Sequence, residues 1–365
     1  MNLSTLNAGI IFKSLFISFL VSILTAIVST HIAIHTNLLD RPNSEPHKLH
    51  KHPVPISGGT ALFSSLIILL IIFREYVSKE FWGVTASAFI IYLFAIWDDF
   101  KALNWKVKLA GQLIGAIILI LTGTRTHLFD ARFFRTRFPS ELCTALDICL
   151  TVFWVLFITN AYNLVDSADG LMIGLSSWAE GFFIIAAMDA GQLDMALYCS
   201  ILLGGSLCLG FFNSYPAFLF MGDSGAQVTG FLLSAIAIIY TPEELLQKNT
   251  WFLPILILGI PIFDTTLVTI SRWRRGEHFY HSGTDHTFHR LLKLGLSSHQ
   301  ASAFMHLIFF ALQSLAFFAI SQSVIEANLI FAVVVLFGII AIIFFEREDL
   351  WKIVKKYIQI NERLS

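Results

Sequence analysis

Charge and cysteine are both scarce in this sequence. Only 13% of its 365 residues are charged, about half the share found in soluble globular domains. The four cysteines, Cys143, Cys149, Cys199 and Cys208, all lie in apolar stretches, where cysteine usually acts as a small apolar side chain. A disulfide framework or a zinc site is therefore not expected. Internal repeats and a polar segment long enough to fold alone are also lacking, so we expect one domain over residues 1–365.

Apolar residues dominate instead, with 56% hydrophobic residues and a mean hydropathy of +0.73. A helix needs about 17 to 25 largely apolar residues to cross a bilayer. Roughly eleven stretches approach this length, near residues 8–34, 57–73, 81–97, 107–123, 142–159, 170–188, 195–212, 225–240, 250–270, 301–322 and 325–345. The sequence therefore predicts an all-α fold, a polytopic membrane bundle of about eleven transmembrane helices. The first stretch lacks a basic leading segment and is too long for a cleaved signal peptide, so we expect it to be the first span.

Lysine and arginine are shared unevenly between alternate loops. Sixteen fall in the set that includes the C-terminal tail, and seven in the other set. Because cytoplasmic loops are enriched in these residues, we expect the C-terminus and the first set to be cytoplasmic. The seven are Arg74, Lys79, Arg125, Arg132, Arg135, Arg137 and Lys248. Four of them lie in the segment 124–141, which we expect to form a small hairpin on the membrane surface.

Five polar loops open on the side expected to be cytoplasmic. The first runs from Asp40 to Gly59 and contains prolines, a Gly-Gly pair and basic residues that include Lys51. Prolines and glycines fix an irregular backbone that can approach a ligand closely, and basic side chains suit phosphate. The alternative is a solvated basic loop that simply follows the orientation rule.

The second loop begins with the adjacent carboxylates Asp98 and Asp99, directly after an apolar stretch. Two ionised groups side by side repel each other, so a pair at a bilayer edge indicates a bound cation or a substrate that needs both. Lys106 and Lys108 follow in the same loop and suit phosphate. A charge cluster that only caps helix ends is the alternative.

The third loop, from Asn160 to Gly170, contains two asparagines and two aspartates but no lysine or arginine. Residues three apart share a helix face, so Asp166 and Asp169 are expected to point at the same place, with Asn163 close to them. Helix capping would explain one of the aspartates. It leaves the other polar residues unexplained.

The fourth loop contains Asn213 and then Phe220 and Asp223, and Asp223 stands among glycines where a helix is expected to begin. Backbone N–H groups at a helix start are unsatisfied, and small neighbours leave room for a cation or a phosphate. The alternative is that Asp223 only caps the helix.

The fifth loop is the longest and is rich in imidazole groups. It runs over residues 272–300 and contains His278, His281, Asp285, His286, His289 and Arg290. Imidazoles can hold phosphate oxygens or transfer protons. A bland loop at the membrane surface is the alternative for this segment.

Together the five loops predict one carboxylate-rich, phosphate-binding pocket on the cytoplasmic face. Its aspartates would hold Mg²⁺, with Mn²⁺ as the alternative, because these ions prefer oxygen ligands. Access from both the cytosol and the lipid indicates phosphoryl transfer between a soluble phosphorylated donor and a lipid acceptor. The expected partners are these two substrates and the bilayer, with no nucleic acid.

The ordered motifs resemble one family of membrane enzymes. They read D-D followed by L-N-W-K-V-K, N-A-Y-N-L-V-D-S-A-D-G-L, F-M-G-D-S-G and D-H-T-F-H-R-L-L-K-L-G. This series resembles the polyprenyl-phosphate N-acetylhexosamine-1-phosphate transferases of glycosyltransferase family 4, to which phospho-MurNAc-pentapeptide translocase is related. The resemblance implies an Mg²⁺-dependent reaction at the bacterial inner membrane, in which undecaprenyl phosphate attacks the β-phosphorus of a UDP-sugar and releases UMP. It also implies a homodimer.

The resemblance assigns a role to each matching position. Asp98 would orient or deprotonate the lipid phosphate, and Asp99 and Asp223 would lie closest to Mg²⁺. Asp166 and Asp169 would organise the nucleotide side with Asn163, while Phe220 would stack on the uracil and Asn213 would help to position it. The phosphate-binding candidates are Lys51, Lys106, Lys108, His286, His289 and Arg290, and the two histidines are also candidate catalytic residues.

Two positions depart from the family pattern, and neither of them belongs to the expected metal ligands. The family's histidine cluster often reads H-x-H-H, whereas Phe288 occupies the middle histidine position here, and Ser167 stands where glycine is common. Since the triple histidine of the peptidoglycan translocase is absent, GlcNAc-1-phosphate is the expected group, transferred to begin O-antigen or a related glycan. GalNAc, FucNAc, QuiNAc and the phospho-MurNAc-pentapeptide remain alternatives.

A membrane transporter is the alternative from a different functional class. Transporters usually carry charges near the bilayer midplane and have repeated halves. In this sequence the charges are expected at helix ends on one side, and no repeat is evident.

Overall fold

The computed structural model describes residues 3–42, 52–241, 251–278, 283–347 and 351. These residues form fourteen helices and one two-stranded sheet, which confirms the all-α prediction. The chain divides into two compact units, residues 1–243 and 244–365. Both consist of helices, and the expectation of one transferase domain over the whole chain stays a prediction.

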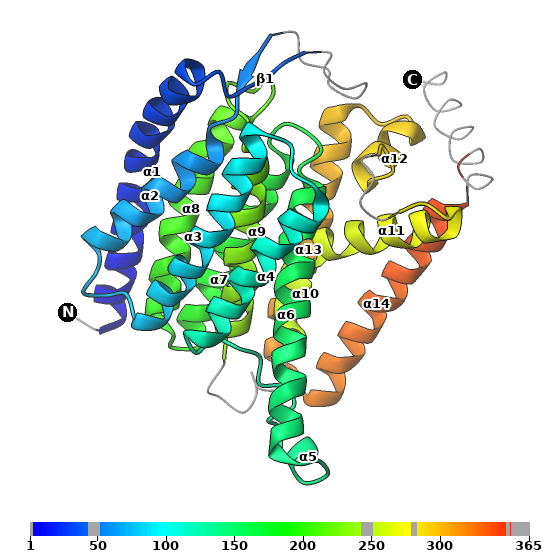
Figure 1. Cartoon of the computed structure of the whole chain (residues 1–365). Helices are drawn as coiled ribbons and strands as arrows, with labels where there is room; N and C mark the ends of the chain where they lie inside the picture. Colours follow the sequence, from blue (N-terminus) through cyan, green and yellow to red (C-terminus); the bar gives the residue numbers. More distant parts are fainter. Residues whose placement is uncertain (1–2, 43–51, 242–250, 279–282, 348–350, 352–365) are drawn as a thin grey trace. The chain divides into compact units, whose positions relative to one another are not determined.

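The first unit is a helical bundle with a short strand pair (Figure 1). Leu39–Asp40 (β1) pairs antiparallel with Val54–Pro55 (β2), and this pair joins the first two helices. The helices are α1 (Leu3–His35), α2 (Gly58–Ile72), α3 (Lys79–Phe100), α4 (Trp105–Leu121), α5 (Arg132–Arg135), α6 (Ser140–Val165), α7 (Leu171–Asp189), α8 (Leu193–Asn213) and α9 (Gly222–Ile239).

Helix α9 is the central helix of this unit (Figure 1). It packs against α2, α3, α6 and α7, and its side chains from Ser224 to Ala237 are all buried. Small residues allow this packing: a Cβ added at Gly230 would lie 2.8 Å from Tyr162 Cβ and 2.9 Å from Thr159 Cα. A helix enclosed in this way has a firmly fixed starting point, and the residues at its start form part of the site described below.

In the second unit, the described residues form five helices, α10 to α14. Helices α13 and α14 both begin with a capping box, in which Ser297 and Ser323 exchange hydrogen bonds with Gln300 and Glu326, a common signal for a helix start. The helices are α10 (Leu253–Ile257), α11 (Gly259–Arg275), α12 (Thr287–Leu294), α13 (Ser298–Ile320) and α14 (Val324–Glu346).

Eight of the described helices are long and apolar enough to cross a membrane. They are α3, α6, α7, α8, α9, α13, α14 and the Ala8–His35 part of α1. The other three expected spans correspond to shorter helices: α2 has 15 residues and α4 has 17, and the stretch 250–270 is divided because α10 ends at Ile257 and α11 begins at Gly259. The chain is thus a multi-pass membrane protein, as the sequence predicted.

The segment 124–141 contains turns and the four-residue helix α5. Asp130 organises these turns, because His127 lies 2.7 Å and Arg135 2.8 Å from its carboxylate. These contacts lower the pKa of Asp130 to about 2. The segment is therefore held by ion pairs around a short helix and not by the strand pairing of a β-hairpin, and its place on the membrane surface stays a prediction.

Candidate active site

Lys108 joins two of the predicted aspartates from different helices. Its Nζ lies 2.7 Å from Asp223 Oδ2, at the start of α9, and also contacts Asp98 Oδ2, in the last turn of α3. The other oxygen of Asp223 accepts a 2.8 Å hydrogen bond from Asn163 Nδ2, in the last turn of α6. Side chains from four helices, α3, α4, α6 and α9, therefore meet around Asp223, and the sequence had marked each of these side chains.

Asp98 and Asp99 are neighbours in the sequence but have different partners. Asp98 Oδ1 accepts a 2.6 Å hydrogen bond from the backbone nitrogen of Leu103, which fixes the turn between α3 and α4. Asp99 accepts hydrogen bonds from the backbone nitrogens of Asp223 and Ser224, at 2.7 and 3.1 Å. Asp99 thus satisfies the amides at the start of α9, a task that a capping residue of the same helix would otherwise perform.

The backbone around Gly222 is closely packed against this pair. Gly222 has a φ of +69°, and a Cβ added there would lie 2.8 Å from Asp99 Oδ1 and would overlap Ile56. The segment before it is held by β2 and α2, since Phe220 N donates to Pro55 O and Gly58 N donates to Phe220 O, both at 2.9 Å. Glycine is required because no other residue combines this φ with this space.

A second layer of polar side chains lies about one helical turn away from this cluster, on helices α4, α6 and α9. Gln112, four residues after Lys108, donates to Gln227 Oε1 at 3.0 Å, and Gln227 is four residues after Asp223. Asn160 Nδ2 donates to Gln112 Oε1 at 2.7 Å, and Asn160 is three residues before Asn163. Residues three or four apart lie on the same helix face. Each of α4, α6 and α9 therefore contributes one residue to the upper layer, formed by Lys108, Asn163 and Asp223, and one to a lower amide layer, formed by Gln112, Asn160 and Gln227.

Asp166 and Asp169 follow α6 and lie near the same cluster. Burial raises the pKa of Asp166 to about 7, and the negative charges of Asp223, Asp169 and Asp99 add to the rise. Asp169 Oδ2 lies 3.4 Å from the backbone nitrogen of Ala217, in the loop before α9. The carboxylates thus share one electrostatic environment. Asp166 and Asp169 do not share a helix face as the sequence predicted, because α6 ends at Val165 and both residues follow it.

Three other predicted residues of this unit contact other parts of it. Asn213 is buried, and its side chain accepts from Gly170 N at 3.1 Å and donates to Leu219 O at 2.9 Å, so it holds two loops together. Phe220 forms a single β-bridge with Ile56. Lys106 is exposed, and its ammonium lies 5.8 Å from the centre of the Trp105 ring. Lys51 lies outside the described residues.

In the second unit, His286 is held by Asp264, which was not among the residues predicted from the sequence. His286 Nδ1 lies 2.9 Å from Asp264 Oδ2, and the backbone nitrogen of Thr287 donates to Asp264 Oδ1 at 2.6 Å. Both side chains are buried, so the orientation of the imidazole is fixed. Phe288 is buried as well, whereas the ring of His289 is only partly buried and lies 6.0 Å from the ring of His286.

Arg290 uses most of its donors within its own unit. Its guanidinium donates to Asp285 O and Phe345 O at 2.7 Å, to Glu346 Oε1 at 3.0 Å, and to Ser271 Oγ. These bonds tie the start of α12 to the ends of α11 and α14. The structure therefore gives Arg290 a structural role, and its predicted contact with phosphate stays a prediction.

The residues around Asp223 suit a divalent cation by their chemistry. Within the described residues, no group of three or more His, Cys, Asp or Glu side chains forms a ready metal site. Mg²⁺, however, is commonly held by one or two carboxylates together with substrate phosphates and water. The mutual repulsion that reaches Asp166 from three other aspartates is the situation that a bound cation relieves. The donor set therefore fits Mg²⁺.

Comparison with known proteins identifies the family. Residues 81–241 match glycosyl transferase family 4. A Bacillus subtilis protein named "Probable undecaprenyl-phosphate N-acetylglucosaminyl 1-phosphate transferase" is 32% identical over 333 residues, which cover 89% of this chain and 90% of that protein. The chain belongs to glycosyl transferase family 4. Enzymes of this family transfer a sugar-1-phosphate onto a polyprenyl phosphate, so the resemblance of the motifs is confirmed.

Two further relatives show the range of the family 4 transferases. The undecaprenyl-phosphate alpha-N-acetylglucosaminyl 1-phosphate transferase of Yersinia pestis is 26% identical over 308 residues, covering 82% of this chain and 80% of that protein. The phospho-N-acetylmuramoyl-pentapeptide-transferase of Lacticaseibacillus paracasei is 29% identical over 208 residues, covering 53% and 63%. Of these three relatives, the two N-acetylglucosaminyl 1-phosphate transferases match more of this chain.

Some residues of the site could have been found in the sequence. Gln112 and Gln227 follow Lys108 and Asp223 by four positions, so helical periodicity would have placed them on the same face. Asp264 is a lone aspartate in an apolar stretch, which is itself a functional signal in a membrane protein. The capping contact of Asp99 had no such signal, because it depends on how α3 and α9 pack.

Proposed function

We propose that this transferase moves GlcNAc-1-phosphate from UDP-GlcNAc to undecaprenyl phosphate, releases UMP, and thereby begins a lipid-linked cell-surface glycan. The relatives from Bacillus subtilis and Yersinia pestis support the sugar and the lipid by their names. The observation that carries the proposal is the cluster of side chains around Asp223. Lys108 contacts both Asp98 and Asp223, and Asn163 donates a hydrogen bond to Asp223. The cluster puts acid, base and amide groups at one point among the ends of membrane helices.

Phosphoryl transfer demands mainly positioning and charge neutralisation. In our proposal, Asp98 orients the lipid phosphate and accepts its proton when that phosphate is protonated. Lys108 lies between Asp98 and Asp223, where it neutralises negative charge on the reacting phosphates. Asp166 and Asp169 bind the nucleotide side together with Asn163, and the side chain of Phe220 stacks on the uracil.

We also propose that Mg²⁺ binds at Asp223 with Asp99 close by, and Mn²⁺ is the alternative. When bound, the cation neutralises charge on the diphosphate and makes UMP a better leaving group. Asp99 keeps lone pairs for this role, because a carboxylate has about four acceptor positions and two are used by backbone amides.

Further proposed phosphate-binding residues are His286, His289 and Arg290, which belong to the second unit, and Lys51. Asp264 holds His286 through Nδ1, so Nε2 would be the atom that contacts a phosphate oxygen. By the distribution of basic residues, we place the active site and the C-terminus on the cytoplasmic side of the bacterial inner membrane. A homodimer is part of the same proposal.

The test is UMP release by purified protein supplied with UDP-GlcNAc and undecaprenyl phosphate. We expect release that needs both substrates and stops when EDTA removes divalent cations. Asp223→Asn keeps the shape of the side chain but removes its charge, so activity should fall by two orders of magnitude or more while the elution volume and secondary structure stay unchanged. Full activity of this variant would refute the mechanism.

A panel of UDP-sugars in the same assay tests the donor. UDP-GlcNAc is expected to give the highest kcat/KM, whereas preference for UDP-GalNAc, a deoxygenated UDP-N-acetylhexosamine or UDP-MurNAc-pentapeptide would replace GlcNAc but keep the reaction. Exchange of labelled UMP into UDP-GlcNAc distinguishes a transferase from a transporter, because a transporter would not catalyse it.

A further inference from the structure

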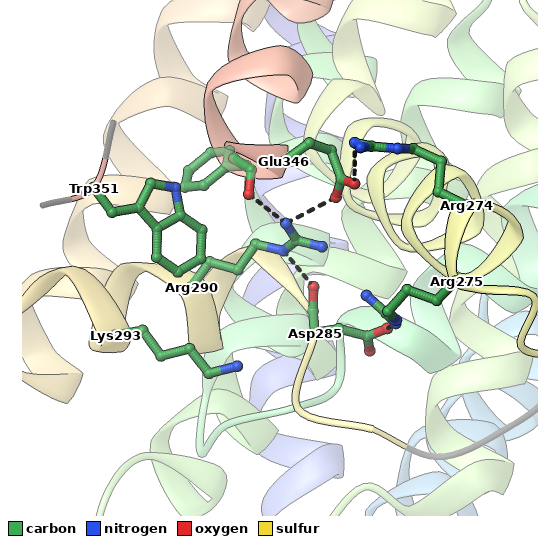
Figure 2. A pocket seen from close by; sticks show the side chains of 8 residues that line it. Arg274, Arg275, Asp285, Arg290, Lys293, Glu346 and Trp351 are labelled. Carbon is green, nitrogen blue, oxygen red and sulfur yellow. Dashed lines mark hydrogen bonds and ion pairs between the residues drawn. The ribbon is translucent and has the colours of Figure 1, made fainter. Parts of the chain in front are cut away.

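A second polar site lies in the unit formed by residues 244–365, where α11, α12 and α14 end or begin (Figure 2). It is a cavity of about 290 Å³ whose charged lining residues are Arg274, Arg275, Asp285, Arg290, Lys293 and Glu346. The proposed transfer reaction uses only Arg290 among them. We call this cavity the arginine pocket.

The arginine pocket carries more positive than negative charge. Four of its lining side chains are cationic and two are carboxylates. Asp285 is shared by Arg272 at 2.9 Å and Arg275 at 2.8 Å. Glu346 is shared by Arg274 at 2.8 Å and Arg290 at 3.0 Å. Arg275 also contacts Glu277 at 2.8 Å. Together with Arg272 and Glu277, five cationic side chains meet three carboxylates, and the excess positive charge suits an anion.

Many N–H donors at the arginine pocket are not used by the described part of the chain. Arg274 donates only through one terminal nitrogen, to Glu346, and Arg275 only through one, to Glu277 and Asp285. The ammonium of Lys293 makes one long contact, 3.3 Å from Thr284 O. The side chains of Arg274 and Arg275 are also well exposed, with 55% and 43% of their surface accessible to solvent. These three side chains can bind a phosphate without breaking an existing ion pair.

The position of the arginine pocket indicates which phosphate it meets. Phe345 and Glu346, which line it, end the span Val324–Glu346, and only 6% of the apolar window of that span is buried within the protein. Trp351 also lines the pocket and donates its indole N–H to Phe344 O at 3.1 Å. Tryptophan and basic residues gather at the end of a span where lipid headgroups lie. A pocket at the end of this span is therefore expected to lie at the level of the phosphodiesters of the bilayer.

We propose that the arginine pocket binds the phosphate of an anionic phospholipid headgroup. The phosphate would contact Arg274, Arg275 and Lys293, while Trp351 and Phe345 would contact the glycerol and the upper acyl chain. Because the pocket is built from the ends of α11, α12 and α14, the bound lipid would link these three helix ends. Clusters of basic residues next to a membrane span commonly recognise anionic lipids in this way.

The test is binding of phosphatidylglycerol to the full-length protein in a neutral detergent, measured by native mass spectrometry across a lipid titration. The variant is the triple substitution Arg274→Gln, Arg275→Gln and Lys293→Gln. The matched control is Arg74→Gln, Lys79→Gln and Lys101→Gln, which removes three exposed positive charges elsewhere. We expect the pocket variant to bind phosphatidylglycerol about tenfold more weakly or worse, and the control to bind within about twofold of the parent protein.

Three further measurements distinguish the sources of phosphate. Zwitterionic phosphatidylcholine should bind equally to the parent and to the pocket variant, and inorganic phosphate at millimolar concentration should not displace phosphatidylglycerol. Displacement by inorganic phosphate would overturn the proposal in favour of a soluble anion. Displacement by a short polyprenyl phosphate would assign the arginine pocket to the acceptor substrate. An equal loss of phosphatidylglycerol binding in the control variant would show that the effect depends only on net charge, and would also overturn the proposal. Because lipid binding is the readout, failure of the proposed transfer reaction would not affect the result.

Discussion

Asp99 Oδ1 lies 2.7 Å from the backbone nitrogen of Asp223, although 124 residues separate the two in the sequence. One carboxylate thus closes the start of α9 and stands beside the residue proposed to hold the metal. Substitution of Asp99 changes two properties at once, the charge of the site and the support of a central helix. Substitution of Asp223 changes mainly the charge.

Asp99→Asn should lower stability as well as activity. The amide oxygen of asparagine can accept from one backbone N–H, but its NH₂ group then faces the second donor, and a lost bond of this kind costs about 1–3 kcal/mol. The apparent Tm in detergent should therefore fall by several degrees. In Asp223→Asn the capping bonds remain, and the bond that is lost is one to the partly exposed side chains of Lys108 or Asn163, so its Tm should fall by less than that of Asp99→Asn. Equal Tm values for the two variants would contradict the capping role.

Substitutions of Lys108 and Lys106 should have very different effects on kcat, although the sequence predicted that both residues bind phosphate. Lys108→Gln leaves Asp98 and Asp223 without their shared cation, so kcat should fall by roughly 10- to 100-fold. Lys106 is exposed, and Lys106→Gln should alter kcat by no more than about twofold. UMP release by both variants in parallel checks this. An equal loss in Lys106→Gln would place its ammonium on a substrate phosphate.

Asp166 should make the stability of the metal-free protein depend on pH. Its pKa is raised to about 7 in the folded protein, against about 3.9 in an unfolded chain. The stabilisation is complete below pH 4 and is lost as the pH rises through 7, because the folded state disfavours the ionised form. In EDTA, Asp166→Asn should therefore raise the apparent Tm at pH 8 relative to the parent protein.

The gain from Asp166→Asn should shrink when the pH is lowered to 5, where the parent carboxyl is protonated. Added Mg²⁺ should also reduce the difference at pH 8, because a cation stabilises the ionised form. A difference in Tm that is the same at pH 5 and pH 8 would show that this carboxyl does not titrate in the range.

The lower amide layer should behave as one unit. Gln112→Leu leaves the buried amide of Gln227 and the partly buried amide of Asn160 without this contact, at a cost of about 1–3 kcal/mol, and Gln227→Leu should cost a similar amount. Because the two side chains contact each other, the double variant should be less destabilised than the sum of the single ones. Thermal unfolding of the four proteins measures this coupling, and strict additivity would show that the contact contributes nothing.

Gly222→Ala should be far more harmful than the same change at an open glycine. The new Cβ would meet Asp99 Oδ1 at 2.8 Å and overlap Ile56, at a φ of +69° that alanine rarely adopts. We expect a fall in apparent Tm of several degrees and a loss of most of the activity. Gly338→Ala is the control, because a Cβ there meets nothing within 4 Å and alanine favours a helix. Similar effects at both positions would refute the steric argument.

The sequence predicted the helical membrane fold and most members of the site, for a physical reason. Long apolar runs are the direct signature of spans, and polar residues are costly enough in a membrane protein that clusters of them mark function. Asp98, Asp166 and Asp223 were recognised in this way. The helix limits agree with the expected spans to within a few residues over most of the chain.

Two features could not be predicted, because they depend on packing between distant segments. Arg290 was expected to hold phosphate by its position in a motif, but its partners include Phe345 O and Glu346 in α14, which no local pattern links to it. The break between α10 and α11 at Leu258 lies in a stretch that is apolar on both sides. Hydropathy alone does not show where a helix in such a stretch is interrupted.

The close approach of Gly59 to Gly225 has an electrostatic consequence of its own. Helix α2 begins at Gly58 and α9 at Gly222, and a Cβ at Gly59 would overlap the backbone of Gly225, so the two helices start side by side. Each helix start carries the equivalent of about half a positive charge from its peptide dipoles. The peptide dipoles at these two helix starts therefore favour the negative charge that Asp99 and Asp223 bring together there, and this contribution would survive the loss of any single basic side chain.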